Sequence, residues 1–404
     1  MSNSVRIASI NMTEKGSTGH IMLQITELAN KKELEAVSFS ANLYRSGKHK
    51  KQIQNHKYFG WNFESFIHTC LGKITGYNGF FSYFGTKQLL RWLDKYDPDV
   101  IHLHNLHAFC INLPQLFRFI KKRKIKVVWT LHDCWVLTGH CPHFVGVGCD
   151  KWKTECHHCP LYKEYPKTYV DRSKELHKKK KKWISEIECL TLVTPSEWLA
   201  KVVEKSFLSG SRLEVINNGI DLNVFKPVYS PEKDLKKKKE EKIVLGVAAG
   251  WGYKKGLDIF ISLSHILPSN YKIILVGTND EIDKRLPENI ISIHKTSNQN
   301  ELVKIYTVSD VFVNPTREDN FPTVNIEALA CGTPVITFNV GGCPESIDET
   351  CGSVVELNDI CSLEREILRV CETSPYSKEN CINRAKLFDK DVKFMEYVKL
   401  YKTL

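Results

Sequence analysis

Polar and acidic side chains gather in the C-terminal half of the chain, where residues 311–345 read VFVNPTREDNFPTVNIEALACGTPVITFNVGGCPE. We predict that a buried strand ends at Asn314–Pro315, that a loop follows over Arg317–Pro322, and that a helix begins near Phe321–Thr323. The first turn of a helix offers unpaired N–H groups and the positive end of the helix dipole. Those features suit a diphosphate or the hydroxyls of a sugar.

Two carboxylates flank this predicted helix start. Seven residues lie between Asp319 and Glu327, which places them about two helical turns apart on one side of a helix. Carboxylates in this position can bind ribose or hexose hydroxyls. The alternative is helix capping by Asp319 or Thr323, with Glu327 in solvent. The GGCPE turn after the next strand brings a second glycine-rich loop close and favours the binding interpretation.

A second glycine-rich turn, AAGWGYKKG over Ala248–Gly256, directly follows a predicted strand. Such a turn can cradle phosphate, and Lys254 and Lys255 would act as point charges against it. A solvent-exposed turn is the alternative. Near the N-terminus, EKGSTGH over Glu14–His20 also follows a strand, and Gly16 and Gly19 would let the backbone approach a ligand closely. Its spacing is not the G-x-G-x-x-G dinucleotide fingerprint, and an ordinary turn is the alternative here.

The segment VWTLHDCWVLTGH places His132 and Asp133 at the carboxyl end of a predicted strand. A histidine there can donate to a sugar oxygen or transfer a proton near neutral pH. The alternative is a structural pair of His132 with Asp133. His104 and His107 follow the preceding strand, and we expect them to lie in the core or to line the site.

Four cysteines fall within the short stretch CPHFVGVGCDKWKTECHHC: Cys141, Cys149, Cys156 and Cys159. Four thiolates this close fit a tetrahedral structural zinc site, and a metal could order a segment with little hydrophobic patterning. The neighbouring histidines are substitute ligands (His140, His143, His157 and His158). The alternative is four reduced thiols in an irregular insertion.

The acidic block resembles the signature of the family-4 retaining glycosyltransferases, two glutamates separated by seven residues, and the resemblance covers nearly the whole chain. It implies the GT-B fold, with two doubly wound Rossmann-like α/β domains facing a central cleft. Asp319 stands at the first acidic position and Glu327 at the second. Relatives more often have glutamate at the first position, and Glu318 is adjacent, so either residue could be the first acid.

The resemblance also assigns roles to the binding residues. The first acid contacts the donor sugar, the second holds the ribose hydroxyls, and Lys255 binds the diphosphate. Many relatives carry an arginine where this chain has Ala249, and we expect Lys254 to supply that charge. The loop Asn320–Pro322 would face the donor sugar and diphosphate, Gly16 and Gly19 would lie at the diphosphate and acceptor, and a histidine placed like His132 contacts the transferred sugar. The family's reaction needs no metal cofactor. The cysteine segment resembles that of a subgroup of bacterial surface-polysaccharide enzymes in the same family.

Alternating strand and helix patterns must position these residues. We predict strands over Val5–Asn11, Asp99–Asn105, Val127–His132, Leu190–Ser196, Leu213–Asn217, Ile243–Ala248, Tyr271–Gly277, Ile290–His294, Val311–Asn314 and Pro334–Phe338. Strand–helix alternation with β-branched strands is typical of parallel sheets covered on both faces. We place an N-terminal acceptor domain over 1–225 with a Cys-rich insertion at 138–166, a linker at 226–241, a nucleotide-sugar domain over 242–385, and a helix over 386–404 that packs back toward the N-terminal domain. The stretch VINNGID, with Asn218, Gly219 and Asp221, is assigned to the domain junction.

The 404 residues carry a formal net charge of +11 and 14 cysteines, without a signal segment or a membrane-spanning apolar run at the sequence level. This pattern predicts a reduced, cytoplasmic protein that binds anions. The run Lys178–Lys182 beside Trp183 suits an anionic membrane surface on the inner face of the cell membrane, with Phe80, Phe81 and Phe84 as an apolar anchor or as core. A solvated helix face is the alternative.

We therefore expect a retaining glycosyltransferase that transfers a hexose-type sugar from a nucleotide-diphosphate sugar to an acceptor hydroxyl. The expected acceptor is a saccharide, and specifically a lipid-linked oligosaccharide of surface polysaccharide or capsule biosynthesis. The alternatives are an inactive transferase-like partner subunit, a nucleotide-sugar epimerase or a sugar phosphorylase. A zinc-containing nucleic-acid binder is disfavoured because the lysines cluster in a linker and one helix, without interleaved stacking aromatics.

Overall fold

The computed structural model describes residues 4–43, 52–107, 109–228 and 240–404. The chain forms two compact units: unit 1 comprises Met1–Ile216 and Phe394–Leu404, and unit 2 comprises Asn217–Lys393. Unit 2 begins before residue 225, where the sequence interpretation ended the first domain. Most of the expected linker over 226–241 lies outside the described residues.

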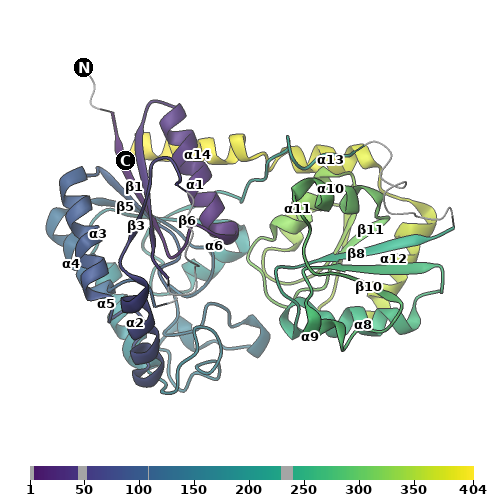
Figure 1. Cartoon of the computed structure of the whole chain (residues 1–404), viewed down its shortest axis with the longest axis horizontal. Coiled ribbons are helices and arrows are strands. Elements are labelled where there is room, and N and C mark those ends of the chain that lie inside the picture. The colour runs from purple at the N-terminus through teal and green to yellow at the C-terminus, as the bar shows by residue number, and fades with distance from the viewer. Residues whose placement is uncertain (1–3, 44–51, 108, 229–239) are drawn as a thin grey trace. The chain divides into compact units, whose positions relative to one another are not determined.

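Unit 1 is built on a sheet of seven parallel strands in the order β3-β2-β1-β4-β5-β6-β7 (Figure 1). Its elements are β1 (Arg6–Asn11), α1 (Gly16–Lys31), β2 (Glu35–Ala41), β3 (His56–Phe59), α2 (Asn62–Thr75), α3 (Tyr83–Tyr96), β4 (Val100–Leu103), α4 (Leu113–Arg123), β5 (Lys126–Thr130), η1 (Val145–Val147), η2 (Lys151–Lys153), α5 (Ser173–Ser185), β6 (Leu190–Thr194), α6 (Glu197–Glu204), β7 (Arg212–Val215) and α14 (Lys390–Thr403).

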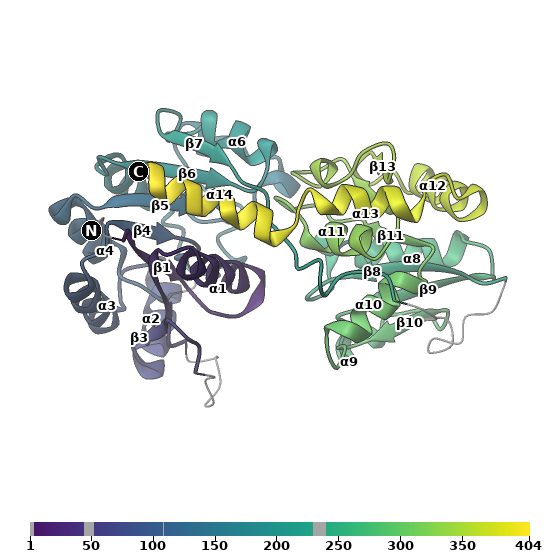
Figure 2. The ribbon, with the colours of Figure 1, turned by 90° about the horizontal axis from the view of Figure 1, so that it is seen from above.

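Both faces of this sheet are covered, which explains why its central strands are apolar throughout. One face packs against α3, α4, α5 and α6, and the other against α1 and α14. Figure 2 shows α14 lying along unit 1, where Phe394, Tyr397 and Tyr401 pack with Ile7 and Val128. The C-terminal helix thus completes the core of unit 1.

Local sequence signals set the helix boundaries. Asn112 accepts a hydrogen bond from the Gln115 N–H and caps α4, Pro114 stands in its first turn, and the basic run Lys121–Arg123 stands in its last turn. Each feature favours a helix over this range, through the cap, the fixed φ of proline and the helix dipole.

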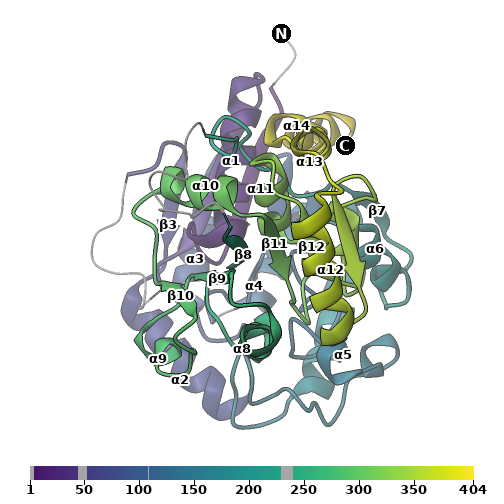
Figure 3. The ribbon, with the colours of Figure 1, turned by 90° about the vertical axis from the view of Figure 1, so that its right-hand side faces the viewer.

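Unit 2 carries a sheet of six parallel strands in the order β10-β9-β8-β11-β12-β13 (Figure 3). Its elements are β8 (Lys242–Val247), η3 (Tyr253–Lys255), α8 (Leu257–Ile266), β9 (Tyr271–Val276), α9 (Asp280–Asp283), β10 (Ile290–Ile293), α10 (Gln299–Val308), β11 (Val311–Asn314), α11 (Thr323–Ala330), β12 (Val335–Phe338), η4 (Pro344–Ser346), β13 (Gly352–Val355), α12 (Ile360–Thr373) and α13 (Lys378–Lys386). Helices α8 and α12 contact each other, and α11 contacts both α10 and α13. The prediction of two doubly wound parallel α/β units is confirmed.

The strand order reverses once in each sheet. In unit 1 the reversal lies between β1 and β4, and in unit 2 it lies between β8 and β11. Ligands of open α/β sheets bind at the carboxyl ends of the strands beside such a switch point. The loops that follow these four strands are therefore the first places to examine. In the described part of the chain, no helix is long and apolar enough to cross a membrane.

Candidate active site

The switch point of unit 2 joins two charged loops. The loop after β8 carries Lys254 and Lys255, and the loop after β11 carries Glu318 and Asp319. The Lys255 Nζ lies 2.8 Å from the Asp319 Oδ2, and the Lys254 Nζ lies 3.0 Å from the Glu318 Oε2. Burial acts to lower the pKa of Lys255, but the charge of Asp319 and its hydrogen bond raise it overall. Two residues predicted to bind phosphate and two predicted to bind the sugar thus meet as ion pairs.

A buried arginine holds these two loops together. The guanidinium of Arg317 makes two hydrogen bonds to the carboxylate of Asp258, of 2.8 and 2.7 Å, and lies 3.9 Å from the ring centroid of Tyr253. The backbone N–H of Arg317 also donates to the carbonyl of Lys254 at 2.9 Å. Sequence reasoning missed this residue. Its only local signal was an arginine inside an otherwise acidic loop, because its partners lie about sixty positions earlier in the chain.

Two glycines permit the close approach of the loops. Gly256 has a φ of +74°, and a Cβ placed on it would lie 2.5 Å from the carbonyl oxygen of Pro315. Gly341, in the loop after β12, has a φ of +57°, and a Cβ there would lie 1.8 Å from the carbonyl oxygen of Asp319. Any other residue would be strained at both positions and would push the backbone apart. The predicted second glycine-rich loop therefore supports the backbone of Asp319.

The helix start agrees with the prediction, but the place of Asp319 does not. Helix α11 begins at Thr323 after Pro322, so Asp319 lies in the preceding loop and not two turns along a helix from Glu327. Pro322 fixes the extended backbone that ends the loop. Asn320 and Phe321 are buried, and Phe321 packs in the core of unit 2. Only backbone groups of these two residues remain suited to ligand contact.

Glu327 is the fifth of the eight residues of α11, and its side chain is partly covered. The Tyr306 hydroxyl donates to its Oε2 at 3.2 Å. Burial raises the pKa of the Glu327 carboxyl to about 7, although the hydrogen bonds with Tyr306 and Thr323 act in the opposite direction. A carboxyl with this pKa exchanges its proton near neutral pH.

At the switch point of unit 1 and after the adjoining β5, two histidines contact each other. His104 Nδ1 and His132 Nε2 are hydrogen-bonded at 2.9 Å, and their rings are stacked. Burial is the main cause that lowers the pKa of His132 to about 4 and holds that of His104 well below its usual value. Both rings are therefore neutral at pH 7. His132 can donate or accept one hydrogen bond but is not a cationic acid.

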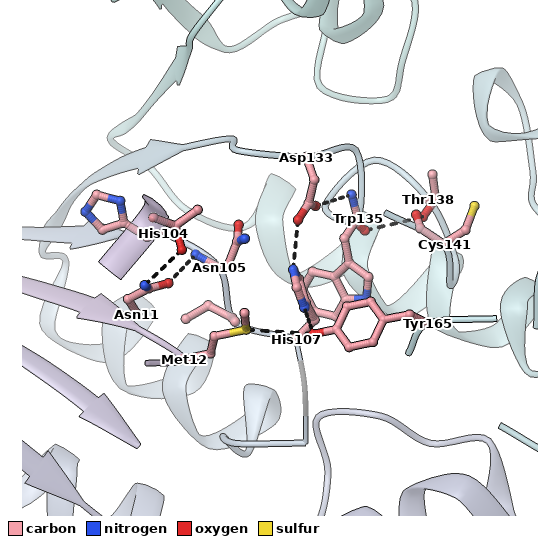
Figure 4. A network of polar contacts seen from close by, with 12 residues as sticks. Asn11, Met12, His104, Asn105, His107, Asp133, Trp135, Thr138, Cys141 and Tyr165 are labelled. Atoms are coloured by element: carbon pink, nitrogen blue, oxygen red, sulfur yellow. Dashed lines mark hydrogen bonds and ion pairs between the residues drawn. The ribbon is translucent and has the colours of Figure 1, made fainter. Parts of the chain in front are cut away.

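Asp133 pairs with His107, whereas the alternative interpretation of the sequence paired it with His132. The Asp133 Oδ2 lies 2.8 Å from His107 Nε2, and His107 Nδ1 lies 2.9 Å from the hydroxyl of Tyr165 (Figure 4). The Trp135 N–H donates to the other Asp133 oxygen. Burial opposes ionisation of Asp133, but the interactions with His107 lower its pKa to about 2. His104 and His107 are buried, as expected for core or lining positions.

The loop after β1 lies at the same sheet edge. Gly16 begins α1 with a φ of +72°, and a Cβ on Gly19 would lie 2.3 Å from the backbone carbon of Glu14. The first turn of α1 therefore packs directly on the loop. The Asn11 side chain accepts from the Asn105 N–H and donates to the Thr13 carbonyl, which ties the ends of β1 and β4 together (Figure 4).

The stretch VINNGID belongs to unit 2 in the structure. The Asn218 side chain donates to the Phe321 carbonyl at 3.2 Å, and Asp221 forms an ion pair with Lys390. Gly219 packs against the backbone of Lys390. The Asn218 contact supports the loop before α11, and the other two join this stretch to the first residue of α14.

The four predicted metal ligands belong to the segment between β5 and α5, but no three of their sulfurs lie within 4.8 Å of one another. Cys141 and Cys156 are buried, and Cys149 and Cys159 are half-buried against the core of unit 1. The sulfurs of Cys141 and Cys159 share a hydrogen bond. Within the described residues, the three-residue group whose ligand atoms all lie within 4.8 Å is a different one, Asp280, Asp283 and His294. The zinc site thus stays a prediction at this point.

Comparison with known families agrees with this architecture. Residues 74–224 match the family described as Glycosyltransferase Family 4, and residues 230–388 match Glycosyl transferases group 1. Among solved structures, sucrose-phosphate synthase from Thermosynechococcus elongatus superposes with a TM-score of 0.73 at 16% identity, covering 99% of this chain and 98% of that one. Anabaena HepE in complex with UDP and glucose gives a TM-score of 0.69 at 16% identity, covering 99% and 100%.

Curated relatives align over parts of the chain. WcaC of Escherichia coli K12, a glycosyl transferase assigned to colanic acid biosynthesis, is 28% identical over 284 residues, or 69% of this chain and 67% of its own. An Escherichia coli UDP-Gal:alpha-D-GlcNAc-diphosphoundecaprenol alpha-1,3-galactosyltransferase is 26% identical over 45% of this chain and 51% of its own. This chain therefore carries a glycosyltransferase family 4 domain followed by a glycosyl transferases group 1 domain, on the two parallel α/β units of the GT-B fold.

Proposed function

We propose that the chain is a retaining glycosyltransferase that transfers a hexose from a nucleotide-diphosphate sugar to an acceptor hydroxyl. The observation that carries this proposal is the set of ion pairs at the switch point of unit 2, where Lys254 and Lys255 meet Glu318 and Asp319. An anionic diphosphate would compete for the lysines, and the released carboxylates would accept hydrogen bonds from sugar hydroxyls. Helix α11 adds its first-turn N–H groups at the same edge.

The two candidate acids have different surroundings. The Glu318 side chain is 5% exposed and faces Lys254, whereas the Asp319 side chain is 23% exposed and faces Lys255. Asp319 therefore fits the acid that contacts the donor sugar, and Glu318 fits a residue that fixes Lys254. Glu327 fits the ribose ligand because it lies on α11 beside the switch point.

Charge stabilisation of the leaving group would carry most of the catalysis. A retaining reaction without an enzyme nucleophile breaks the bond between the anomeric carbon and the diphosphate oxygen. The acceptor oxygen bonds to the anomeric carbon on the same face, and its proton goes to the departing diphosphate. Lys255 would stabilise the charge that develops on that diphosphate. His132 would serve as a neutral hydrogen-bond partner for a sugar hydroxyl, consistent with its low pKa.

The relatives support a lipid-linked acceptor. One is named for transfer to a diphosphoundecaprenol-linked sugar, and another, from Campylobacter jejuni, is a diphospho-undecaprenol alpha-1,3-N-acetylgalactosaminyltransferase. WcaC is assigned to colanic acid biosynthesis. We therefore propose that the acceptor is a lipid-linked saccharide of surface polysaccharide biosynthesis.

Two helices of unit 1 offer a docking face for the membrane that holds such a lipid. Helix α2 exposes an apolar stripe at helical spacing: Phe63, Phe66, Ile67, Leu71 and Ile74. Its C-terminal end contacts the start of α5, where Arg172 donates to the Thr75 carbonyl. On α5 the lysines at 178, 179, 181 and 182 are exposed, but Lys180 is buried, so the predicted basic run presents four charges and not five. Phe84 is exposed, whereas Phe80 and Phe81 are half-buried.

Vesicle co-sedimentation tests this docking face. We expect binding to vesicles of mixed anionic and zwitterionic lipid, and loss of binding in Phe63→Ser/Phe66→Ser and in Lys181→Gln/Lys182→Gln. A Lys295→Gln/Lys399→Gln variant removes the same number of exposed charges elsewhere and should bind normally. Equal binding of all variants would overturn the assignment of this surface.

Turnover with a defined donor tests the transferase itself. Nucleoside diphosphate should be released only when an acceptor is present, and the product should keep the anomeric configuration of the donor by NMR. An epimerase would convert the donor without a saccharide acceptor, and a sugar phosphorylase would cleave a saccharide with inorganic phosphate and leave the nucleotide sugar unchanged. An inactive partner subunit would bind nucleotide without release under any condition. Lys255→Ala should abolish release, and Lys295→Ala should not.

A further inference from the structure

The segment between β5 and α5 is long and has little regular structure. Over residues 131–172 its regular elements are the two short 3-10 turns η1 and η2. Loops of this length in a compact domain are uncommon unless something orders them. Part of the order is apolar, because Phe144 and Trp152 stack at 4.7 Å between ring centroids. Trp135, Leu137 and Leu161 also pack in the core of unit 1, and the sulfurs of Cys141 and Cys156 are buried beside them.

Hydrogen bonds hold the sulfur or the backbone of the cysteines in this segment. The Gly139 N–H donates to the Cys156 Sγ at 3.2 Å, and the Leu161 N–H donates to the sulfur of Cys159. The Cys159 N–H is fixed by Asp171 at 2.8 Å. Backbone N–H groups aimed at sulfur are the outer contacts that orient thiolate ligands and stabilise their charge. Neutral structural thiols have little need of them.

A buried cation lies against the same sulfurs. Lys180 is 3% exposed, its Nζ donates to the Trp135 carbonyl, and it lies 3.6 Å from the Trp135 ring centroid. Burial lowers the pKa of Lys180 to about 7, and the charges of Cys156, Cys141 and Asp133 oppose that shift. Within the described residues no carboxylate lies within ion-pair distance of Lys180, and an ammonium buried without such a contact is costly. Thiolates would supply the opposite charge.

From these observations we infer that Cys141, Cys149, Cys156 and Cys159 bind one structural zinc ion, whose excess negative charge is balanced by Lys180. Four thiolates on Zn²⁺ carry a net charge of about −2, which matches a site with a buried cation and N–H donors beside it. The Cys141–Cys159 pair already shares a hydrogen bond. Metal binding would release the thiol protons and draw Cys149 and Cys156 to that pair.

The zinc would act on the candidate active site through the backbone. The Cys134 N–H donates to the carbonyl of Pro142, next to Cys141, and Thr138 donates to the Cys141 carbonyl. Tyr165, which bonds to His107, lies shortly after Cys159. A closed metal site would therefore fix both ends of the His107–Asp133–Tyr165 network. Its role would be structural, without contact to substrate.

Metal analysis of the full chain tests the inference without any substrate, so its result is separate from that of the proposed function. Protein purified without chelator should contain about one zinc per chain by mass spectrometry of metals. Cys141→Ser and Cys159→Ser should lose the metal. Cys189→Ser and Cys361→Ser, at exposed cysteines outside the segment, should keep it.

Cobalt replacement tests the ligand set in the wild-type chain, even where a cysteine variant fails to fold. Co²⁺ bound to four thiolates should show intense visible bands of tetrahedral geometry and sulfur-to-cobalt charge transfer. Lys180→Met should weaken zinc about tenfold in competition with a chelating dye, which is about 1.4 kcal/mol; Lys182→Met should not. Absence of metal together with no uptake of Zn²⁺ or Co²⁺, octahedral cobalt bands, or a Cys141–Cys159 disulfide in the isolated protein would overturn the inference.

Discussion

The two switch points of this chain occupy equivalent places in two similar sheets but contain different chemistry. At the β8/β11 edge of unit 2, charged side chains meet as ion pairs, led by Lys255 with Asp319. At the β1/β4 edge of unit 1 and on the adjoining β5, the groups are mainly buried histidines, such as His104 with His132, that stay neutral.

This difference teaches how one fold divides the work of sugar transfer. A charged ligand can separate an ion pair at little cost in free energy. The lysine then contacts the phosphate, and the carboxylate accepts a hydrogen bond from a hydroxyl. Neutral imidazoles bind hydroxyls without adding charge. The unit 2 edge is therefore suited to a diphosphate and the unit 1 edge to saccharide hydroxyls. The predictions below are ordered by the size of the expected effect.

The largest effect is expected from removing the charge at the unit 2 edge. Lys255→Ala should lower kcat about 10²- to 10³-fold, because it removes a group that stabilises the leaving diphosphate. Lys254→Ala should have a smaller effect on kcat and mainly raise KM for the donor. Steady-state kinetics with Lys295→Ala as the matched control measures both. Equal losses from Lys254→Ala and Lys255→Ala would remove the distinct role given to Lys255.

Removing the side chain that joins the two loops of the unit 2 edge should lower both the stability of the protein and its affinity for nucleotide. Arg317→Met removes charged hydrogen bonds to Asp258 and should lower the free energy of unfolding by about 2 kcal/mol. It should also weaken nucleotide binding, because the two loops separate. Arg369→Met removes a more exposed pair with Glu366 and should cost less than about 1 kcal/mol. Denaturant titration with calorimetric binding checks both; an unchanged nucleotide affinity in a folded Arg317→Met protein would contradict the supporting role.

The neutral histidines of unit 1 should make the protein sensitive to mild acid. The folded-state pKa values of His102 and His132, about 3 and about 4, lie below the unfolded value of 6.5, mainly because of burial. Between pH 6.5 and 4 the unfolded chain binds more protons, so stability falls as pH falls, by up to about 1.4 kcal/mol per pH unit for each histidine. Denaturant titrations from pH 7.5 to 4.5 should show this slope, reduced in His132→Asn. If His132→Asn left the dependence of stability on pH unchanged, the lowered pKa of His132 in the folded protein would be contradicted.

Glu327 should contribute with the opposite sign and a smaller effect. Its folded pKa of about 7 lies above the ordinary value of 4.5, so its contribution to stability is lost as pH rises from about 4.5 to 7. Donor affinity should rise a few-fold between pH 6 and 8, as the carboxylate forms and accepts from ribose hydroxyls. Glu327→Gln, in which Asp319 is kept, should flatten the dependence of donor affinity on pH. A wild-type profile without pH dependence would exclude Glu327 as the titrating ligand.

Much of the fold was predictable, because the inner strands read as short apolar β-branched runs. The strands near Val127–His132 and Ile243–Ala248 match β5 and β8 to within two residues at each end. By contrast, β2 was missed because EAVSFSA alternates small polar residues with apolar ones, and β3 is a four-residue edge strand. Helix α2 was missed although its apolar residues recur at helical spacing, and the residues it buries, Ser65, His68, Thr69 and Gly72, are small or polar.

The site was predictable where its residues are close in sequence and not where they are distant. Lys255 and Asp319 were identified from a glycine-rich turn and from an acidic motif by family resemblance. Arg317 could not be assigned, because its contacts with Tyr253 and Asp258 join separate loops. The pairing of Asp133 with His107 joins loops after two strands in the same way. Long-range pairing of this kind depends on how the sheet places loop ends, which a single sequence does not encode locally.

Calorimetric titration of UDP, GDP and ADP into the wild-type chain and Lys255→Ala tests the central claim most directly. The account predicts that one nucleoside diphosphate binds the wild type, that its affinity falls with added salt, and that Lys255→Ala weakens it at least tenfold. Lys295→Ala should bind like the wild type. Binding of equal strength in wild type and Lys255→Ala, or no binding of any of the three nucleotides, would contradict the assignment of the β8/β11 edge as the donor site.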